Sequence, residues 1–494
     1  MNYISTRNKN IRISSAQAIS QGISKDGGLF VPEEIPVLSA EDFKYLSSVD
    51  YIERAAFVLK KYLTDFTEEE IYACVRGAYT GSFDNEIPAP IVKTKNGVNI
   101  LELWHGPTCA FKDLALQLLP YLLTTSAKKV SGGKEIVILV ATSGDTGKAA
   151  LEGFCDVDNT KIIVFYPSDG VSAMQKLQMD TQKGENVCVC AIKGNFDDAQ
   201  TGVKNIFTNN ETAELLDKNN MQFSSANSIN WGRLVPQIVY YISAYCDLLA
   251  KGEDLSGGFN VVVPTGNFGN ILAAYYAKVM GVPVNKLICA SNANNVLTDF
   301  INTGVYDRNR DFYTTISPSM DILISSNLER MVFELCGRDD ELVANLQADL
   351  SQNGKYQVSD EIAQKFADLF FGGCCDDGKT KETIAKYFND FGYLSDTHTA
   401  VALKVYDEYV EKSGDTRTAV IASTASPYKF AASVLEALGE ELADSEFATV
   451  KKLSKLTNTT IPKPLAALEN ATPRFKNLVE KQDMTTFVLK TLGI

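Results

Sequence analysis

The feature that most constrains the fold is a unit that recurs along the chain: a short apolar run, a turn rich in glycine or hydroxyl residues, and a helical stretch. The apolar runs are residues 136–140, 161–166, 186–192, 260–263 and 419–422. Uniformly apolar runs are typical of parallel strands, because the helices that link such strands cover both faces of the sheet. The sequence therefore predicts an α/β fold with parallel sheets covered by helices, and ligands at the carboxyl ends of the strands, where the turns lie.

A chain of 494 residues is too long for one core and is predicted to divide into several units. Residues 1–92 are predicted to form a mostly helical N-terminal domain, because apolar residues recur there at helical spacing. Residues 93–304 are predicted to form an α/β core with a smaller subdomain at about 130–225. We expect a helical insertion at 305–395 and a C-terminal segment, 396–494, that completes the core.

Composition excludes several classes of function. The net charge of −14 argues against a nucleic-acid partner, because no basic surface is available to displace counterions from phosphates. The 10 cysteines form no C-x-x-C pair and there are only 2 histidines, so we predict no metal site and free thiols in a reducing compartment. The N-terminus has no apolar secretory segment and no run approaches the ~20 apolar residues of a membrane span. We expect a cytoplasmic protein, monomeric or homodimeric, with no membrane partner.

One lysine stands at an unusual place. A Gly-Pro turn leads to Phe111-Lys112-Asp113 at the start of a predicted apolar helix, residues 114–123. A cation at a helix N-terminus faces the positive end of the helix dipole, whereas a lysine held as a neutral amine or imine avoids that penalty. Lys112 is therefore a candidate catalytic residue, although a solvated first-turn lysine would show the same pattern.

Two turns between a buried strand and a helix are candidate anion sites. Gly266-Asn267-Phe268-Gly269-Asn270 combines two glycines with a helix start, so that backbone N–H groups can surround a phosphate. It is not the dinucleotide-binding G-x-G-x-x-G. The second turn offers hydroxyls and amides that suit a carboxylate, or alternatively a simple helix cap at Ser143 or Asp145; its candidate residues are Thr142, Ser143, Asp145 and Thr146.

Two further segments carry polar groups after predicted strands. Asn227, Ser228 and Arg233 lie within seven residues and would suit a second phosphate, or would form an exposed loop before the next helix. Thr424 follows the last strand, where its hydroxyl could face a ring nitrogen or cap a helix.

Two other patterns are rejected. Residues 373–380 satisfy the Walker A expression, but the preceding residues 360–371 look helical, and Asp376 and Asp377 stand where phosphates would bind. A serine-hydrolase triad is excluded because only His105 and His398 are available and no G-x-S-x-G elbow exists.

Taken together and in this order, these segments resemble threonine synthase, in the branch found in fungi and many bacteria. The resemblance covers nearly the whole chain, and residues 105–113 are its most specific part. It implies a fold-type II pyridoxal-phosphate (PLP) enzyme, similar to the tryptophan synthase β subunit. Lys112 then stands at the Schiff-base position, residues 266–270 at the loop for the coenzyme phosphate, and Thr424 at the pyridine nitrogen. Asn227, Ser228 and Arg233 stand at positions that approach the substrate phosphate.

The resemblance further implies a reaction in which O-phospho-L-homoserine and water give L-threonine and phosphate, with the freed Lys112 amine as the base. Two departures are visible: Cys109 replaces a familiar leucine, and Ser426 replaces a familiar histidine. The alternatives are a sibling fold-type II lyase, such as a threonine dehydratase or a cysteine synthase, and a non-catalytic homologue. A sibling lyase needs no second phosphate site, and a silent homologue would be expected to lose Lys112.

Overall fold

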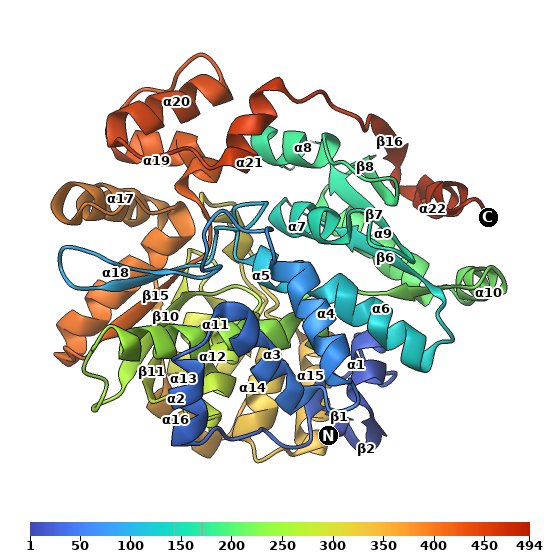
Figure 1. Ribbon diagram of the computed structural model, residues 1–494, viewed down its shortest axis with the longest axis horizontal. Helices are drawn as coiled ribbons and strands as arrows, with labels where there is room; N and C mark the ends of the chain where they lie inside the picture. The colour runs from blue at the N-terminus through green and yellow to red at the C-terminus, as the bar shows by residue number, and fades with distance from the viewer. Residues whose placement is uncertain (143, 169–170) are drawn as a thin grey trace.

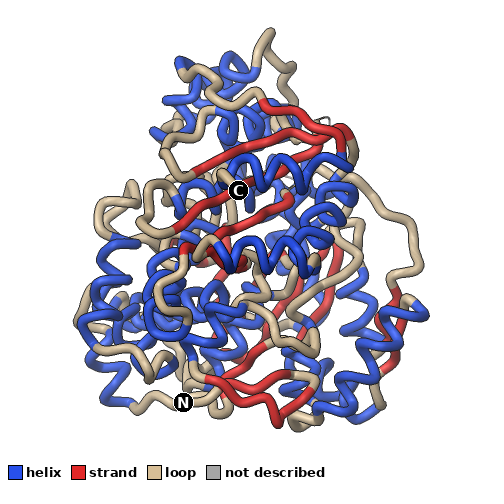
Figure 2. Tube along the Cα trace, turned by 90° about the vertical axis from the view of Figure 1, so that its right-hand side faces the viewer, coloured by secondary structure: helices blue, strands red, loops and turns tan. Residues whose placement is uncertain are grey.

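The framework of the computed structural model is a pair of parallel sheets with helices on both sides (Figures 1 and 2). The model describes residues 1–142, 144–168 and 171–494. In the large sheet the strand order is β14-β11-β10-β15-β5-β4, with only β4 antiparallel to its neighbour. Its strands are β4 (Ile91–Lys93), β5 (Asn99–Glu102), β10 (Phe259–Pro264), β11 (Val284–Ser291), β14 (Phe370–Cys374) and β15 (Ala419–Ser423). The predicted α/β fold with parallel sheets is confirmed.

The small sheet has the order β16-β8-β7-β6-β9 and is wholly parallel. Its strands are β6 (Glu135–Ala141), β7 (Thr160–Pro167), β8 (Val187–Lys193), β9 (Met221–Ser224) and β16 (Asn477–Glu480). Most side chains of β6 and β7 are buried, as expected for strands covered on both faces. The last strand, β16, comes from the C-terminus, so the small unit is closed by residues about 250 positions beyond its predicted range.

The N-terminal region packs four helices beside an antiparallel sheet of order β2-β1-β3. The helices begin where the sequence supplies caps: Ser14, Ser39 and Thr67 each accept a hydrogen bond from the backbone N–H three residues later. The elements are β1 (Tyr3–Ser5), β2 (Asn8–Ile13), β3 (Phe30–Pro32), α1 (Ser15–Gln21), α2 (Ala40–Leu46), α3 (Tyr51–Tyr62) and α4 (Glu68–Tyr79).

The remaining helices cover the two parallel sheets. In the core they are α5 (Lys112–Leu116), α6 (Leu119–Val130), α7 (Asp145–Phe154), α8 (Ala173–Asp180), α9 (Phe196–Thr208), α10 (Asn210–Lys218), α11 (Trp231–Ala250), α12 (Gly269–Val279) and α13 (Val296–Thr303). Beyond them lie α14 (Leu328–Leu335), α15 (Asp340–Asn353), α16 (Asp360–Leu369), α17 (Asp377–Phe391), α18 (Thr397–Ser413), α19 (Ala431–Ala437), α20 (Glu446–Thr457), α21 (Lys463–Ala466) and α22 (Met484–Leu492). None of the helices that the structure describes is long and apolar enough to cross a bilayer.

The segment 305–395 is not a purely helical insertion, and that expectation is wrong. Its strand β14 pairs in parallel with β11 at the edge of the large sheet, while β12 (Val305–Asp307) and β13 (Lys355–Gln357) form a separate antiparallel pair. The sequence pattern missed β14 because Phe370 and Phe371 continue the apolar spacing of α16 without a break.

The Walker-like residues 373–380 therefore do follow a strand, so a preceding helix is no longer a reason to exclude nucleotide binding there. The acidic residues remain a reason to exclude it. Asp376 caps α17 by accepting a hydrogen bond from Lys379 N at 2.8 Å, and Asp377 accepts from Ile316 N at 3.3 Å. Carboxylates occupy the helix start where a P-loop would hold phosphate.

The order of the large sheet decides where the candidate residues meet. Because β10, β15 and β5 are adjacent and parallel, the loops that follow their carboxyl ends emerge side by side. These loops carry Gly266, Thr424 and Lys112, respectively. The chain after β5 is tied to β15 by Leu103 N, which donates to Ser423 O at 2.9 Å, and by Phe111 N, which donates to Thr424 O at 2.8 Å. Helix α5 then contacts α7 of the small unit and α11 of the large unit, near the centre of Figure 1.

Candidate active site

Lys112 is the first residue of α5 and its side chain is almost fully buried. Its Nζ donates to Ser319 Oγ at 3.2 Å and lies 3.7 Å from Asp145 Oδ2. Burial lowers the pKa of Lys112 from 10.5 to about 8; Asp145 opposes this shift, and the positive charges of Lys429 and Arg233 add to it. An amine with this pKa has a substantial neutral fraction at mildly alkaline pH, which a nucleophile or general base requires.

Asp145 is the only carboxylate among the described residues that forms an ion pair with Lys112. Its Oδ1 lies 2.7 Å from Lys429 Nζ and accepts a hydrogen bond from Gln175 Nε2 at 3.1 Å. Burial alone would raise the pKa of Asp145, but the two lysines hold it well below its usual value. Asp145 is therefore ionised at any physiological pH and anchors two buried ammonium groups.

A tight turn holds Lys112 in place. Thr108 donates to Asp113 through both its backbone N, at 2.9 Å, and its Oγ1, at 2.6 Å. Gly106 packs directly on this pair, since a Cβ there would come within 2.5 Å of the Asp113 side chain. Burial raises the pKa of Asp113 to about 6. The residues that flank Lys112 thus fix the start of α5 from both sides.

Arg233 is buried in the first turn of α11 and has no carboxylate partner among the described residues. Its Nη1 donates to Ala226 O at 2.8 Å. Burial lowers the pKa of Arg233 to about 10, and no neighbouring charge offsets this effect. A buried guanidinium without a counterion is costly unless a ligand supplies the negative charge. Lys112 and Lys429 share Asp145, whereas Arg233 is a buried cation without a carboxylate partner among the described residues.

The loop 266–270 shapes the start of α12. Phe268 adopts φ 63°, the left-handed region, and no side chain caps the helix. The Phe268 ring itself is buried against Phe370, so this residue contributes backbone rather than side chain to the loop. Asn327 bridges this loop to the predicted phosphate segment, because its Nδ2 donates to Asn267 O at 3.1 Å and to Ser228 O at 3.2 Å.

The turn before α7 is organised by Thr142. Its Oγ1 accepts hydrogen bonds from Gly144 N at 3.0 Å and Gly147 N at 2.9 Å. Gly144 is the N-terminal residue flanking α7, and no side chain caps the helix, so Asp145 is not a cap. Thr146 is half-buried in the first turn. Ser143 lies outside the described residues.

Part of the segment 227–233 is a turn that is held by hydrogen bonds within the segment. Asn227 is exposed, and its Oδ1 accepts hydrogen bonds from Ser228 Oγ at 3.3 Å and Ile229 N at 3.2 Å. Asn230 caps α11 through Gly232 N. Among the predicted phosphate residues, only Arg233 is close enough for its charge to lower the pKa of Lys112. Ser228 is joined to the 266–270 loop through Asn327.

Three residues near Lys112 were not predicted from the sequence: Ser319, Lys429 and His398. Lys429 lies only five residues after Thr424, within the segment that was singled out, but a lone lysine gives no signal of its role. Ser319 lies in the segment expected to be an insertion. His398 Nε2 accepts a hydrogen bond from Ser319 N at 3.1 Å.

The comparisons with known proteins point to one family. Family models match three consecutive parts of the chain: threonine synthase N terminus over 2–79, pyridoxal-phosphate dependent enzyme over 84–367, and threonine synthase, C-terminal, over 399–488. The threonine synthase of Saccharomyces cerevisiae is 36% identical over 97% of this chain and 98% of its own. A PLP-bound threonine synthase from Brucella melitensis has a TM-score of 0.89 and 36% identity, over 99% of both chains.

The chain belongs to the threonine synthase family.

The relatives of this threonine synthase family member are not all of one kind. A human protein named threonine synthase-like 1 is 42% identical over 86% of this chain, but the match covers only 58% of that protein. The chain spans about three-fifths of the length of the vertebrate relatives it matches.

Pyridoxal phosphate is the cofactor of this family, and the residues present in the chain fit it. Asn270 Nδ2 is buried and has no partner among the described residues, although its Oδ1 accepts a hydrogen bond from Tyr241. A buried unpaired amide is costly unless a ligand accepts its hydrogen bond. The uncapped start of α12 supplies backbone N–H groups for a phosphate. Gly266 has no room for a side chain, since a Cβ would lie 2.8 Å from Ser319 O.

Thr424 lies on the same edge of the large sheet as Gly266. Thr424 is buried at the carboxyl end of β15, and it does not cap the following helical turn, η2 (Pro427–Phe430). That cap is Ser426, whose Oγ accepts a hydrogen bond from Tyr428 N at 3.4 Å. Ser426 therefore has a structural task where a histidine was expected.

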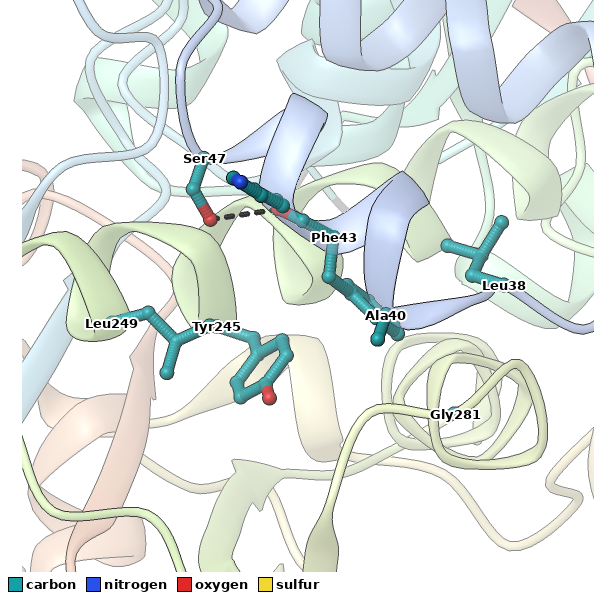
Figure 3. Close-up of a pocket in the computed structure, with 8 residues that line it drawn as sticks. Leu38, Ala40, Phe43, Ser47, Tyr245, Leu249 and Gly281 are labelled. Carbon is teal, nitrogen blue, oxygen red and sulfur yellow. Dashed lines mark hydrogen bonds between the residues drawn. The ribbon is translucent and has the colours of Figure 1, made fainter.

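One surface hollow lies away from these residues. It is formed by α2 and α11, and Figure 3 shows Phe43, Tyr245 and Leu249 along its wall. It contains none of the residues around Lys112 and no buried charge. The buried ions around Lys112, rather than this hollow, indicate where the chemistry takes place.

Proposed function

We propose that this chain is a PLP-dependent threonine synthase that converts O-phospho-L-homoserine and water to L-threonine and phosphate. The observation that carries the proposal is the charge of the site: Lys112 and Lys429 both pair with the buried carboxylate of Asp145. The buried Arg233, whose positive charge helps to lower the pKa of Lys112, has no carboxylate partner among the described residues. Buried cations of this kind favour the binding of anions, although the chain as a whole carries a net charge of −14. A substrate with a carboxylate and a phosphate, beside a cofactor phosphate, supplies those anions.

In this proposal each residue has one task. The bound cofactor supplies an electron sink for charge that develops on the substrate carbons. Lys112 Nζ, with its lowered pKa, would remove the proton from the α-carbon, release it, and then remove a proton from the β-carbon as the bond between the γ-carbon and the phosphate oxygen breaks. Arg233 would bind the phosphate that leaves. Protons then return to the γ-carbon and the α-carbon, and the hydroxyl of water adds to the β-carbon. The backbone of Gly266 to Asn270 and the side chain of Asn270 would hold the cofactor, and Thr424 is the residue that we assign to its ring nitrogen.

Asp145 and the turn from Thr142 to Thr146 complete the proposed site. Asp145 holds Lys429 and directs the Lys112 amine, and the N–H groups at the start of α7 bind the substrate carboxylate. Asn227 and Ser228 form the outer wall of the phosphate site. We further propose that the enzyme works in the cytoplasm, because all ten cysteines are unpaired, and that it acts as a monomer or homodimer.

A sibling lyase is the second candidate function, and Arg233 separates the two. Such an enzyme acts on an unphosphorylated amino acid and has no use for a buried guanidinium without a counterion. In Arg233→Ala, we expect the transition state to lose roughly 2–4 kcal/mol of stabilisation, because a charge-assisted contact with the phosphate is lost. This loss lowers kcat/KM for O-phospho-L-homoserine on the order of 30- to 1000-fold. Slow turnover of L-threonine or L-serine as a side reaction should change little.

The measurement is kcat/KM for a phosphorylated and an unphosphorylated substrate with the same protein sample. The matched control is Arg76→Ala, because Arg76 is exposed on α4. Circular dichroism and the cofactor spectrum should match those of the wild type. Parallel losses on both substrates, or a wild-type protein that deaminates threonine faster than it forms it, would favour the sibling lyase.

A further inference from the structure

We propose that Ser319 is a catalytic residue of this enzyme and that His398, fixed by Asp396, positions it. The proposal deepens the proposed function and rests on it, because it concerns the same Lys112 amine. Ser319 comes from η1 (Pro318–Met320), a short helical turn in a part of the chain that no sequence motif marks. Its Oγ is the only hydroxyl among the described residues that accepts a hydrogen bond from Lys112 Nζ, at 3.2 Å.

The segment around Ser319 covers the proposed cofactor loop. Ser319 O lies 2.8 Å from where a Cβ of Gly266 would be, so its backbone packs directly on that glycine. Farther along the segment, Ser325 Oγ donates to Gly266 O at 2.7 Å and Asn327 N donates to Asn267 O at 3.0 Å. A shift of this segment would therefore move both the partner of Lys112 and the wall of the loop.

The His398 imidazole determines where Ser319 lies. Its Nε2 accepts a hydrogen bond from Ser319 N at 3.1 Å, so this nitrogen carries no proton. The proton of the neutral ring is then on Nδ1, which donates to Asp396 Oδ1 at 2.9 Å. The ring is 2% exposed and packs edge-on against Phe430. A protonated Nε2 would face the Ser319 N–H as a second donor and would release the segment.

Asp396 is itself immobilised by its place in the fold. It caps α18: Oδ1 accepts from His398 N at 2.8 Å, and Oδ2 accepts from Thr399 N at 3.3 Å and from Thr399 Oγ1. The contacts form one continuous series from the start of α18, through the imidazole and the backbone of Ser319, to the amine of Lys112. Each member is buried or half-buried, so the series is rigid and largely screened from water.

This series of contacts fixes the orientation of the Lys112 amine. A neutral amine has two N–H groups and one lone pair, and the lone pair must point at the substrate carbon to accept its proton. The hydrogen bond from Nζ to Ser319 Oγ uses one N–H and removes the rotational freedom of the group. Ser319 is thus expected to affect the chemical step more than substrate binding, and His398 is expected to act only through Ser319.

The test uses the holoenzyme and four variants. Ser319→Ala removes the hydroxyl and Ser319→Thr keeps it. His398→Leu removes the acceptor, while His398→Gln keeps an oxygen that can accept from Ser319 N. Thr314→Ala is the control, since Thr314 is exposed on the same segment. We expect kcat to fall about tenfold or more in Ser319→Ala and His398→Leu with KM within a factor of about three, in keeping with a lost orienting contact. Ser319→Thr and His398→Gln should recover most of kcat.

Two readouts do not depend on turnover. Hydrogen exchange of the Ser319 amide in the holoenzyme should be at least about tenfold faster in His398→Leu than in the wild type, and protected again in His398→Gln. The chain has only 2 histidines, so a long-range ¹H–¹⁵N spectrum of ¹⁵N-histidine-labelled enzyme resolves both rings, and His398→Gln assigns them. We expect the His398 ring to be the neutral Nδ1–H tautomer.

An Nε2–H or doubly protonated ring, equal exchange in His398→Leu and His398→Gln, or unchanged kcat in Ser319→Ala would each overturn the proposal. A loss confined to KM in Ser319→Ala would also overturn it, because it would place the hydroxyl in substrate binding. If the wild-type chain forms no threonine from O-phospho-L-homoserine, the proposed function fails. The ring tautomer and the amide exchange then still decide whether His398 positions Ser319.

Discussion

At the scale of single residues, burial lowers the pKa of Lys112, and the neighbouring charges determine how far it is lowered. The pKa of about 8 results from desolvation and from the positive charges of Lys429 and Arg233, against the attraction of Asp145. The amine is therefore protonated below about pH 8 and neutral above it. An exposed lysine would lose its proton only near 10.5. Covalent uptake of the cofactor requires the neutral amine.

We predict that the rate of covalent cofactor uptake by the apoenzyme rises with pH and levels off above about pH 8. The change in cofactor absorbance after mixing, recorded between about pH 6 and pH 10, measures this rate. In Asp145→Asn the midpoint should move to lower pH, because a negative charge that favours the ammonium form is removed. Lys112→Ala should bind cofactor without a borohydride-stable adduct. A midpoint near 10, or a label on another lysine, would contradict the assignment.

At the scale of elements, the start of α12 combines three features that suit an anion: a glycine without space for a side chain, a left-handed residue at 268 and no side-chain cap. The first N–H groups of such a helix lack a hydrogen-bond acceptor within the helix, and a bound anion can supply one. The loop gains rigidity from outside, since Asn327 N and Ser325 Oγ bind its carbonyl groups.

Gly266→Val should therefore weaken cofactor affinity by about tenfold or more, because a side chain at this position collides with the backbone of Ser319 and opens the loop. Asn270→Ala should weaken it as well, since it removes the unpaired buried amide. Equilibrium dialysis of the cofactor measures both effects. Gly257→Val is the control, because a Cβ at Gly257 meets only Arg417, at 3.7 Å. Unchanged affinity in Gly266→Val would mean that the loop has only a structural role.

At the scale of the whole molecule, the C-terminus completes the small sheet. Strand β16 pairs with the edge of β8, and Met484, Val488 and Leu492 of α22 are buried in the core on that side of the sheet. Burial of three such side chains contributes on the order of 5–9 kcal/mol. The small unit, which carries Thr142 and Asp145, therefore depends on residues at the far end of the chain.

Deletion of residues 477–494 should lower the thermal unfolding temperature and promote aggregation, because it exposes both the edge of β8 and the apolar surface under α22. Differential scanning calorimetry and light scattering measure these effects. Leu478→Ser is the matched control, since Leu478 lies on β16 but is 51% exposed. A truncated chain that unfolds at the wild-type temperature would show that the small unit is stable by itself.

The sequence by itself determined what depends on neighbours along the chain. Buried strands, the turns after them and the helix starts are local patterns, so the α/β class could be predicted, and Lys112 and the 266–270 loop could be proposed as site residues. Strand β14 was missed because its apolar spacing continues that of α16, and β16 because four residues at a half-exposed edge give no periodic signal. Only the tertiary structure brought Asp145 to Lys429 and His398 to Ser319, across 284 and 79 positions, respectively. A lone lysine, serine or histidine has no local pattern; its pKa, its tautomer and its partner depend on which strands lie side by side and on how much water the packing excludes.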